Sequence, residues 1–261
     1  MDELWLTEGP REFDRWLHSG IVEPGAVSRI REGLETTREG RIDDVTTGQS
    51  PEVYFPGLTA RPWWDHGAFP WIAGLEAQSD AITEELLAFG SRPRPSVSHP
   101  TGLADAGVWR ALYLTSIGRP QDENRKAFPK TLQALEPTPG GTECGMTYFS
   151  TIEGGTHIKP HSGFTNAHLR CHLTLVSSGE SRIRVSDTVR TWEKGTVLVF
   201  DDTFEHEVWN DGEGSRTVLL FDIWHPELSG PEIKALEFMM GVWRRMYARH
   251  YWASQLTSRS A

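Results

Sequence analysis

Five of the ten histidines lie in one stretch of the chain, where they could gather as metal ligands. They are His157, His161, His168, His172 and His206. Imidazole is a borderline ligand that suits iron, zinc, copper and nickel. Taken singly, a histidine is more often a structural residue than a ligand. The clustering therefore indicates where a metal centre should be sought, without defining its ligands.

The spacing of these histidines argues against a zinc hydrolase. HIKPH at 157–161 and HLRCH at 168–172 each place two histidines four residues apart, which on a helix would share one face. Pro160 and the preceding glycines disfavour a helix for the first pair. The glutamate of the HEXXH pattern is absent, and neither a third protein ligand nor a general base is apparent.

The segment 168–176 alternates between polar and apolar residues. In a strand, period-two alternation places His168, Arg170, His172 and Thr174 on one face. The other face would carry Leu169, Cys171, Leu173 and Leu175. The polar face suits a pocket for a charged ligand inside a small barrel, and the apolar face suits the core. A polar face exposed to solvent is equally compatible with the alternation.

Arg216 opens the apolar run RTVLLFDIW, which is typical of a buried strand. A buried guanidinium needs a partner. That partner could be a protein carboxylate such as Asp201, Asp202 or Asp222, or the carboxylate of a bound ligand. The sequence leaves these two possibilities even.

Short apolar runs separated by the turns SSGE, EKG and NDGEGS predict the elements that carry these residues. Strands are expected at 109–117, 146–152, 167–176, 181–186, 196–200, 205–209 and 216–224. Helices are expected in the first fifty residues, at 71–90, at 122–136 and along the tail from 233, and a loop is expected at 91–107. The spacing of the strands favours a sandwich or barrel-like double sheet.

Composition narrows the function classes. The net charge of -10 argues against a nucleic-acid-binding protein, which needs a basic face. Two cysteines, Cys144 and Cys171, are too few for a disulfide framework. We see neither a signal peptide nor an apolar run long enough to span a membrane. A cytoplasmic protein without membrane contact is the expectation.

Three long segments carry a resemblance to a known family. They are YFPGLTARPWW from residue 54, FSTIEGGTHIKPHSGFTNAHLRCHLTLV from residue 149, and VRTWEKGTVLVFDDTFEHEVWNDGEGSRTVLLFDIWHPEL from residue 189. Together they resemble the aspartyl/asparaginyl β-hydroxylase family, most strongly over 150–228. The resemblance implies a mainly β fold with flanking helices, a double-stranded β-helix of the jelly-roll or cupin type. It also implies an Fe(II)- and 2-oxoglutarate-dependent dioxygenase with O2 as co-substrate.

The resemblance assigns the metal ligands to His161 and His206. Most oxygenases of this kind add a carboxylate two residues after the first histidine. Gly163 stands at that position here, and its lack of a side chain matches the family's exception. Water would take the third place, or Asp202 could act through a contact with it.

The resemblance also assigns residues that bind 2-oxoglutarate. Arg216, ten residues after His206, matches the residue that binds the distal carboxylate, with Ser150 assisting. Arg170 and His172 match residues near the carboxylate beside the keto group. A bidentate guanidinium–carboxylate pair would hold this dicarboxylate strongly and directionally.

The departures from the family concern the substrate. His168 stands where the family's vertebrate enzyme holds its target carboxylate with an arginine, so His168 becomes a candidate substrate-binding residue. Arg125 and Leu132 stand where that enzyme has a local disulfide. A small amino-acid derivative, a carrier-bound residue or a peptide is expected as substrate, with hydroxylation of an aliphatic carbon that releases succinate and CO2.

Two further functions remain open. A halogenase would use the space left by Gly163 for chloride. A non-catalytic β-barrel would bind an organic acid through its histidine and arginine side chains. For every one of these functions, the chain is expected to form a single domain over residues 1–261. Its expected parts are a helical extension at 1–52, an oxygenase core at 53–228 and a C-terminal helix at 229–261 packed on the core.

Overall fold

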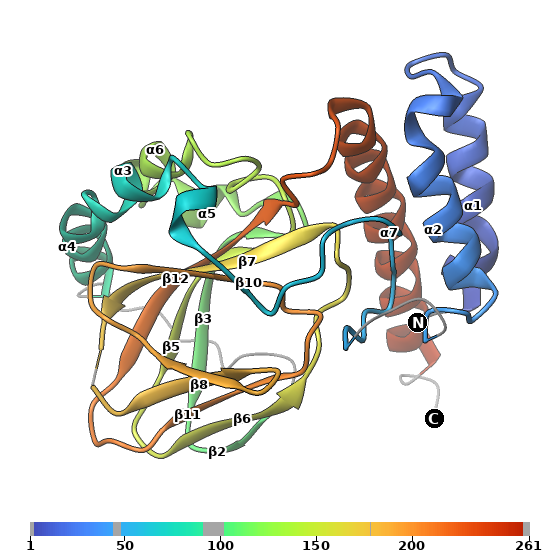
Figure 1. Cartoon of the computed structure of the whole chain (residues 1–261). Coiled ribbons are helices and arrows are strands. Elements are labelled where there is room, and N and C mark those ends of the chain that lie inside the picture. The colour runs from blue at the N-terminus through green and yellow to red at the C-terminus, as the bar shows by residue number, and fades with distance from the viewer. Residues whose placement is uncertain (1–2, 44–47, 91–101, 178, 258–261) are drawn as a thin grey trace. The chain divides into compact units, whose positions relative to one another are not determined.

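The computed structural model describes residues 3–43, 48–90, 102–177 and 179–257 (Figure 1). Contacts divide the chain into two compact units. The first comprises Met1–Thr46, Glu52–Thr59 and Pro226–Ala261, and the second comprises Thr47–Pro51 and Ala60–His225. The first unit is helical, and the second contains both β-sheets.

The helical unit consists of α1 (Glu3–Leu17), η1 (Pro24–Val27), α2 (Ser28–Arg38) and α7 (Gly230–Thr257). Trp16 of α1 stacks on Phe238 of α7, with ring centroids 5.2 Å apart. The start of α7 is capped reciprocally: the Ser229 amide and hydroxyl donate to Glu232 at 2.8 Å, and the Glu232 amide lies 3.4 Å from the Ser229 hydroxyl. Arg29 of α2 forms an ion pair with Glu232 at 3.3 Å.

The C-terminal helix, α7, packs on the other helices of its own unit. Within the first unit, its apolar stripe packs on α1, α2 and η1, and its expected packing on the β-sheet core stays a prediction. Residues Glu52–Thr59 also group with these helices. A stripe at three- and four-residue spacing specifies that one face is buried, and it does not specify the partner. The expected boundaries at 53 and 228 stay a prediction.

The second unit holds two antiparallel sheets. The larger has the order β1-β10-β7-β12-β5-β3-β4, and the smaller has the order β2-β6-β11-β8-β9. The larger sheet contains β1 (Trp63–Trp64), β3 (Trp109–Ser116), β4 (Arg119–Pro120), β5 (Thr147–Ile152), β7 (His168–Val176), β10 (Val197–Phe200) and β12 (Arg216–Trp224). The smaller contains β2 (Ala104–Ala106), β6 (Thr156–His161), β8 (Ser181–Val185), β9 (Thr188–Thr191) and β11 (His206–Asn210).

From β5 to β12 the chain winds between the two sheets. β5, β7, β10 and β12 are neighbours in the larger sheet, and β6, β8, β9 and β11 are neighbours in the smaller. These eight strands form a double-stranded β-helix, which confirms the expected fold class. The remaining elements, η2 (His66–Ala68), α3 (Ile72–Glu76), α4 (Ser79–Gly90), α5 (Asp122–Arg125) and α6 (Pro129–Leu135), are short helices. Figure 1 shows α3, α4 and α6 on the side of the larger sheet away from the smaller one.

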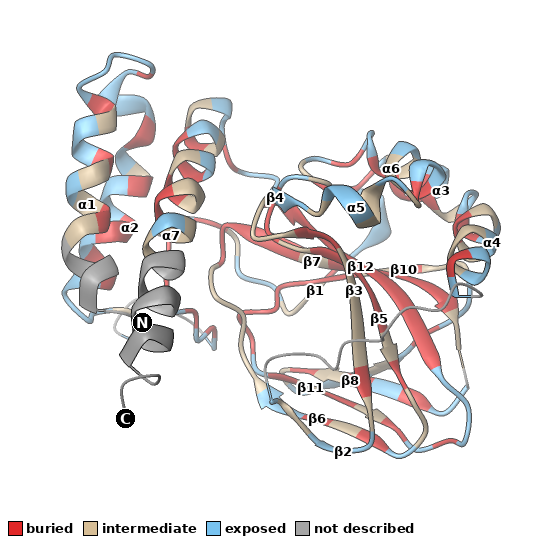
Figure 2. Ribbon diagram, turned by 180° about the vertical axis from the view of Figure 1, so that it is seen from behind, coloured by how far each residue is buried: buried red, intermediate tan, exposed pale blue. Residues whose placement is uncertain are grey.

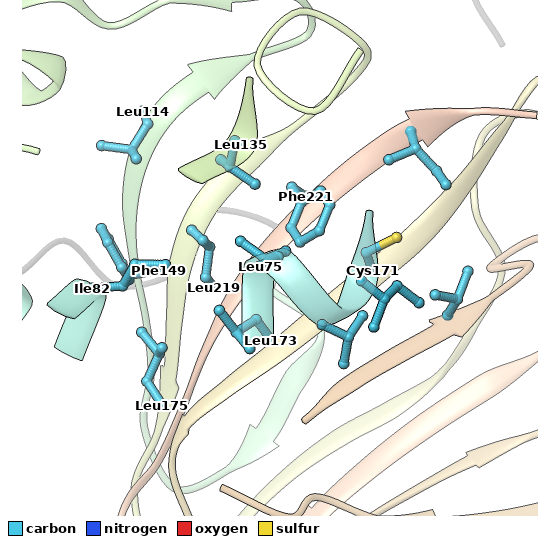
Figure 3. Packing of buried hydrophobic residues seen from close by; sticks show 14 of the residues in the cluster. Leu75, Ile82, Leu114, Leu135, Phe149, Cys171, Leu173, Leu175, Leu219 and Phe221 are labelled. Atoms are coloured by element: carbon cyan, nitrogen blue, oxygen red, sulfur yellow. The ribbon is translucent and has the colours of Figure 1, made fainter. Parts of the chain in front are cut away.

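An outer core lies between these helices and the larger sheet. Leu75 and Ile82 from the helices meet Leu173, Leu219 and Phe221 from the strands (Figure 3). Leu169, Cys171 and Leu175 belong to the same cluster, which confirms that this face of β7 is apolar core. Figure 2 shows that β12 is buried along its whole length.

An inner core lies between the two sheets. Ile152, Val218 and Leu220 of the larger sheet meet Ile158, Ile183 and Val208 of the smaller. The even-numbered residues of β7 and β12 face this space because the odd-numbered ones face the helices. The polar face of β7 therefore lines the barrel interior rather than solvent.

The element boundaries differ from the expectation in a few places. The helix expected at 71–90 is two helices, α3 and α4, and the helix expected at 122–136 is split into α5 and α6, because Pro129 begins a new helix. Strands β1, β4, β6 and β9 were not predicted. Most of the loop expected at 91–107 lies outside the described residues, which resume at 102 and include β2.

Candidate active site

A β-bulge brings His161 onto the inner face of the barrel. His206 of β11 pairs with His161 of β6, but Val208 pairs with Ile158. Three steps along β6 therefore match two steps along β11. Ile158 already faces inward, so regular alternation would turn residue 160 inward and His161 outward. The extra residue reverses this, and Pro160 is tolerated there because a bulge leaves an amide unpaired.

The two imidazoles lie side by side with the same nitrogen tied to the backbone. Their ring centroids are 4.1 Å apart. Nδ1 of His161 lies 2.8 Å from the Lys159 carbonyl, and Nδ1 of His206 lies 3.0 Å from the Phe204 carbonyl. A carbonyl only accepts, so each Nδ1 carries a proton and each Nε2 keeps its lone pair. Burial lowers the pKa of both rings, which favours the neutral form that binds a metal.

The Asp202 carboxylate occupies the space beside Gly163. A Cβ atom built on Gly163 would overlap both carboxylate oxygens of Asp202. The Gly163 amide also donates to the Asp202 carbonyl at 2.6 Å, which holds the two segments together. Any side chain at position 163 would have to displace a buried acidic group. The glycine is therefore required by the approach of Asp202, in addition to removing a third ligand.

Arg170 holds that carboxylate in place. Its Nη1 lies 2.7 Å from Oδ2 of Asp202, and its Nε donates to Asp222 at 3.0 Å. Two buried carboxylates on one guanidinium raise its pKa further above the usual value, although burial opposes this. Asp202 and Asp222, which the sequence allowed as partners of Arg216, thus pair with Arg170. The expected contact of Arg170 with 2-oxoglutarate stays a prediction.

Arg216 is a buried cation without a carboxylate partner. Its side chain is 1% exposed, and its Nε and Nη1 have no hydrogen-bond acceptor. No Asp or Glu of the described chain forms an ion pair with it. Its guanidinium carbon lies 4.1 Å from the centroid of the Trp192 ring. Burial lowers its pKa to about 9, so it remains protonated at neutral pH and would gain from an anion.

Two more polar groups beside β12 lack partners. Nε2 of His172 and the hydroxyl of Thr174 are buried without a hydrogen bond. His172 accepts the indole N–H of Trp192 on Nδ1 at 3.3 Å, so its free Nε2 is the protonated one. Burial, and next the positive charge of Arg216, lower the pKa of His172 well below its usual value. A neutral donor, a hydroxyl and a cation thus lie on the inner face without acceptors.

Ring contacts connect the histidine pair to this polar group. Phe200 lies 5.7 Å from His206 and 5.0 Å from His172, measured between ring centroids. His172 in turn lies beside Trp192, and Trp192 lies beneath Arg216. One continuous wall therefore runs from the candidate metal ligands to the unpaired cation.

Ser150 and His168 lie at other points of the inner face. The Ser150 hydroxyl is buried and accepts the Trp109 indole N–H at 3.0 Å, and the residue pairs with Val218 in the ladder. The hydroxyl keeps its own proton for another acceptor. His168 opens β7 opposite Trp224 and is buried, with no hydrogen bond to Nδ1. Their expected roles stay predictions.

The structure brings His161, His206, His172 and Arg216 together along one wall. Among the described residues, no group of three or more His, Cys, Asp or Glu side chains is arranged to hold a metal. Sequence reasoning missed Trp192, because it lies just after β9 in the irregular connection to β10, where no periodicity applies. Thr174 was placed on the correct face by alternation but was given no role.

The sequence from 76 to 226 matches the family model described as aspartyl/asparaginyl beta-hydroxylase. This match covers more than half of the chain. The chain belongs to the aspartyl/asparaginyl β-hydroxylase family. Membership implies an oxygenase that uses iron and 2-oxoglutarate. The neutral histidine pair fits a metal, and the buried unpaired Arg216 fits a carboxylate of the keto acid.

Individual relatives share the same region. The human aspartyl/asparaginyl beta-hydroxylase is 38% identical over 187 residues, covering 69% of this chain and 25% of the relative. This chain thus spans about a quarter of that protein's length. The ornithine lipid ester-linked acyl 2-hydroxylase of Rhizobium tropici is 32% identical over 191 residues, covering 70% of this chain and 67% of the relative.

Solved structures give a weaker comparison. A predicted oxalate decarboxylase from Thermotoga maritima aligns with 52% of this chain and 95% of its own, with a TM-score of 0.34 and 14% identity. Separately, every helix in the described segments is too short or too polar to cross a membrane.

Proposed function

We propose that this protein is an Fe(II)- and 2-oxoglutarate-dependent hydroxylase of an aliphatic carbon. The observation that carries the proposal is the wall from the His161–His206 pair to Arg216. At one end lie two neutral imidazoles whose Nδ1 atoms are already engaged. At the other lies a buried cation whose Nε and Nη1 lack an acceptor. A metal ion and a dicarboxylate satisfy both ends at once.

Each residue has a separate task in this reaction. His161 and His206 would hold the iron through Nε2, and Arg216 would hold the distal carboxylate of 2-oxoglutarate. When bound, Fe(II) and 2-oxoglutarate supply an oxidation by O2 that hydroxylates the substrate and releases succinate and CO2. Arg170 keeps the Asp202 carboxylate beside the third position, and Phe200 excludes water between His206 and His172.

The substrate is proposed to carry an aliphatic carbon next to a carbonyl group. The names of two relatives support this class. The β-carbon of an aspartyl or asparaginyl residue adjoins its side-chain carbonyl, and carbon 2 of an acyl chain adjoins the ester carbonyl. For this chain we favour an Asp- or Asn-like amino acid that is free, carrier-bound or within a peptide. His168, buried with Nδ1 unpaired, is its candidate contact. A cytoplasmic location and the lack of a nucleic-acid partner remain predictions.

The geometry favours hydroxylation over halogenation. A halogenase needs space for chloride beside the iron, at the position that Gly163 leaves vacant. The Asp202 carboxylate already occupies the space where a side chain at position 163 would begin, which leaves less room there for chloride. Product analysis with and without added chloride tests this directly, and a chlorinated product would reverse the preference.

The first experiment measures the weak visible charge-transfer band of the Fe(II)–2-oxoglutarate chelate under anaerobic conditions. Wild type is compared with His161→Ala, His206→Ala and Arg216→Ala. His157→Ala is the matched control because it belongs to the same HIKPH segment. Its ring stacks on Trp209 and interacts with Asp105 and Glu207 rather than with His206.

The band should appear in wild type and in His157→Ala. It should vanish in both other histidine variants and weaken in Arg216→Ala. Consumption of 2-oxoglutarate in a substrate screen would then separate a hydroxylase from a barrel that only binds organic acids. Folded, iron-loaded wild type that shows no band would contradict the proposal.

A further inference from the structure

Trp192 contacts Arg216, to which the proposed function assigns the distal carboxylate of 2-oxoglutarate, and His172, which the family resemblance places near the carboxylate beside the keto group. It lies between β9 and β10 and is 3% exposed. The face of its ring lies 4.1 Å from the Arg216 guanidinium carbon, measured to the ring centroid. Its indole N–H donates to Nδ1 of His172 at 3.3 Å. One side chain therefore acts on Arg216 and on His172 through two different atoms.

The hydrogen bond from the indole N–H determines which nitrogen of His172 carries the proton. An indole nitrogen only donates, so Nδ1 of His172 must accept and cannot carry hydrogen. In a neutral imidazole the proton then resides on Nε2. That Nε2 is buried and has no acceptor among the described residues. Without this hydrogen bond the two tautomers could exchange, and part of the population would present a lone pair to an anionic ligand.

The ring of Trp192 stabilises Arg216 without neutralising it. Stacking on an aromatic face attracts a guanidinium through the ring quadrupole and restricts its plane. A protein carboxylate in the same place would occupy the hydrogen-bond donors of the cation. Here Nε and Nη1 stay unpaired, although the side chain is 1% exposed. The stacked arrangement keeps the charge and the donors available for a ligand.

We propose that Trp192 is a positioning residue for 2-oxoglutarate, which it serves by holding Arg216 flat and by fixing the tautomer of His172. This inference rests on the proposed function. Thr174, whose buried hydroxyl lies on the same strand face and has no partner, adds a third group to this binding surface. Trp192 itself need not touch the ligand.

Two variants separate the two contacts. Trp192→Phe keeps an aromatic face under Arg216 and removes the N–H, whereas Trp192→Leu removes both. Trp209→Phe is the matched control, because Trp209 also contacts a histidine and an arginine. His157 stacks on it at 5.6 Å and Arg182 lies 5.1 Å from its ring, but neither belongs to the inner face.

The first measurement is the dissociation constant of 2-oxoglutarate for the Fe(II)-loaded full chain without O2. Loss of one hydrogen bond predicts about a tenfold rise for Trp192→Phe, and loss of the ring as well predicts about a hundredfold rise for Trp192→Leu. 2-Oxobutyrate, which lacks the distal carboxylate, serves as a second probe. The preference for 2-oxoglutarate over 2-oxobutyrate should collapse in Trp192→Leu and persist in Trp192→Phe. A merely structural role would weaken both ligands equally.

The second measurement is the ¹⁵N spectrum of the histidines in the metal-free protein. Wild type and Trp209→Phe should show His172 protonated on Nε2 alone, and Trp192→Phe should show a tautomer mixture. Wild type with His172 protonated on Nδ1 would overturn the inference without needing any variant to fold. Wild-type affinity in Trp192→Phe and Trp192→Leu would also overturn it. Failure of wild type itself to bind 2-oxoglutarate would instead overturn the proposed function.

Discussion

The two faces of the larger sheet are built from the same strands and have opposite character. On the helix side of β12, Leu219 and Phe221 pack against other apolar side chains of the outer core. On the barrel side, Arg216 is buried with unpaired hydrogen-bond donors. His172 on the neighbouring strand is also buried, and its Nε2 has no hydrogen-bond partner. The outer face consists of packed apolar side chains, whereas the inner face carries buried donors that lack a hydrogen-bond acceptor.

This difference teaches that burial alone does not identify a core. All nine residues of β12 are buried, yet only the odd-numbered ones contribute to the outer hydrophobic cluster. A buried polar group without a partner costs folding free energy, so a fold retains it where a ligand satisfies it. The contrast between the faces can be tested by substitutions on each side.

Arg216→Met should produce the largest effect, and it should act on binding alone. Breaking a buried ion pair between Arg216 and the keto acid predicts a loss of about 3 kcal/mol or more, or at least about a hundredfold in affinity. The metal-free protein should melt at or above the wild-type temperature, since an unpaired buried cation is removed. Calorimetric titration and thermal melting measure the two effects.

Arg182→Met is the control for that substitution. Arg182 also lies over a tryptophan ring, at 5.1 Å from Trp209, but it is half exposed and paired with Asp211. Neither affinity nor melting temperature should change appreciably. A large fall in stability for Arg216→Met would show that the inner face is structural after all.

Leu219→Ala should have the reverse signature. Removing a fully buried leucine from the outer core predicts a loss of about 2–5 kcal/mol in the free energy of unfolding, because a cavity remains. The folded fraction should bind 2-oxoglutarate with wild-type affinity. Urea unfolding measures the stability of Leu219→Ala, and titration of the same sample measures its affinity for 2-oxoglutarate. A loss of affinity along with the loss of stability would mean that the two faces are coupled.

Asp201→Asn tests whether the buried carboxyl of Asp201, in the loop that leads to His206, keeps its proton in the folded protein. Asp201 is 1% exposed, and its carboxylate accepts from Gln49 at 2.6 Å and from the Thr203 amide at 3.0 Å. Burial has the largest effect on this carboxyl and raises its pKa to about 6 from the ordinary value of 3.8, although these donors favour the ionised form.

The sign of the pH effect follows from that shift. Between pH 4 and 6 the folded chain keeps a proton that the unfolded chain has lost. Raising the pH through this window therefore destabilises wild type, by up to about 3 kcal/mol, with no further change above it. Asp201→Asn lacks this titration, so its stability relative to wild type should rise from pH 4 to 6. Urea unfolding across that range checks it, and a constant difference would contradict the shift.

Cys171→Ala should have the smallest effect. Cys171 is fully buried in the outer core, and burial raises the pKa of its thiol well above the usual value. The native protein should therefore resist a thiol reagent at neutral pH until it unfolds. Removing one small buried side chain predicts about 1 kcal/mol of destabilisation and no change in ligand affinity. Fast labelling of the native thiol would show that this face opens readily.

Sequence patterns predicted seven of the strands, the alternation on β7 and the buried position of Arg216. These features follow from local periodicity, because successive residues of a strand face opposite sides. The family motifs singled out His161 and His206, whose rings lie side by side in the structure, and their assignment as metal ligands stays a prediction. The apolar stripe of the C-terminal helix indicated that one face is buried, but such a stripe does not specify which element covers that face.

Only the tertiary structure decided which residues meet in the candidate site. The bulge that turns His161 inward depends on pairing between β6 and β11, which no local pattern specifies. The choice of Arg170, rather than Arg216, as partner of Asp202 and Asp222 depends on which strands are neighbours. The same holds for Trp192, which is distant from His172 and Arg216 along the chain. Local sequence sets which side of a strand a residue faces, and long-range packing sets what it meets there.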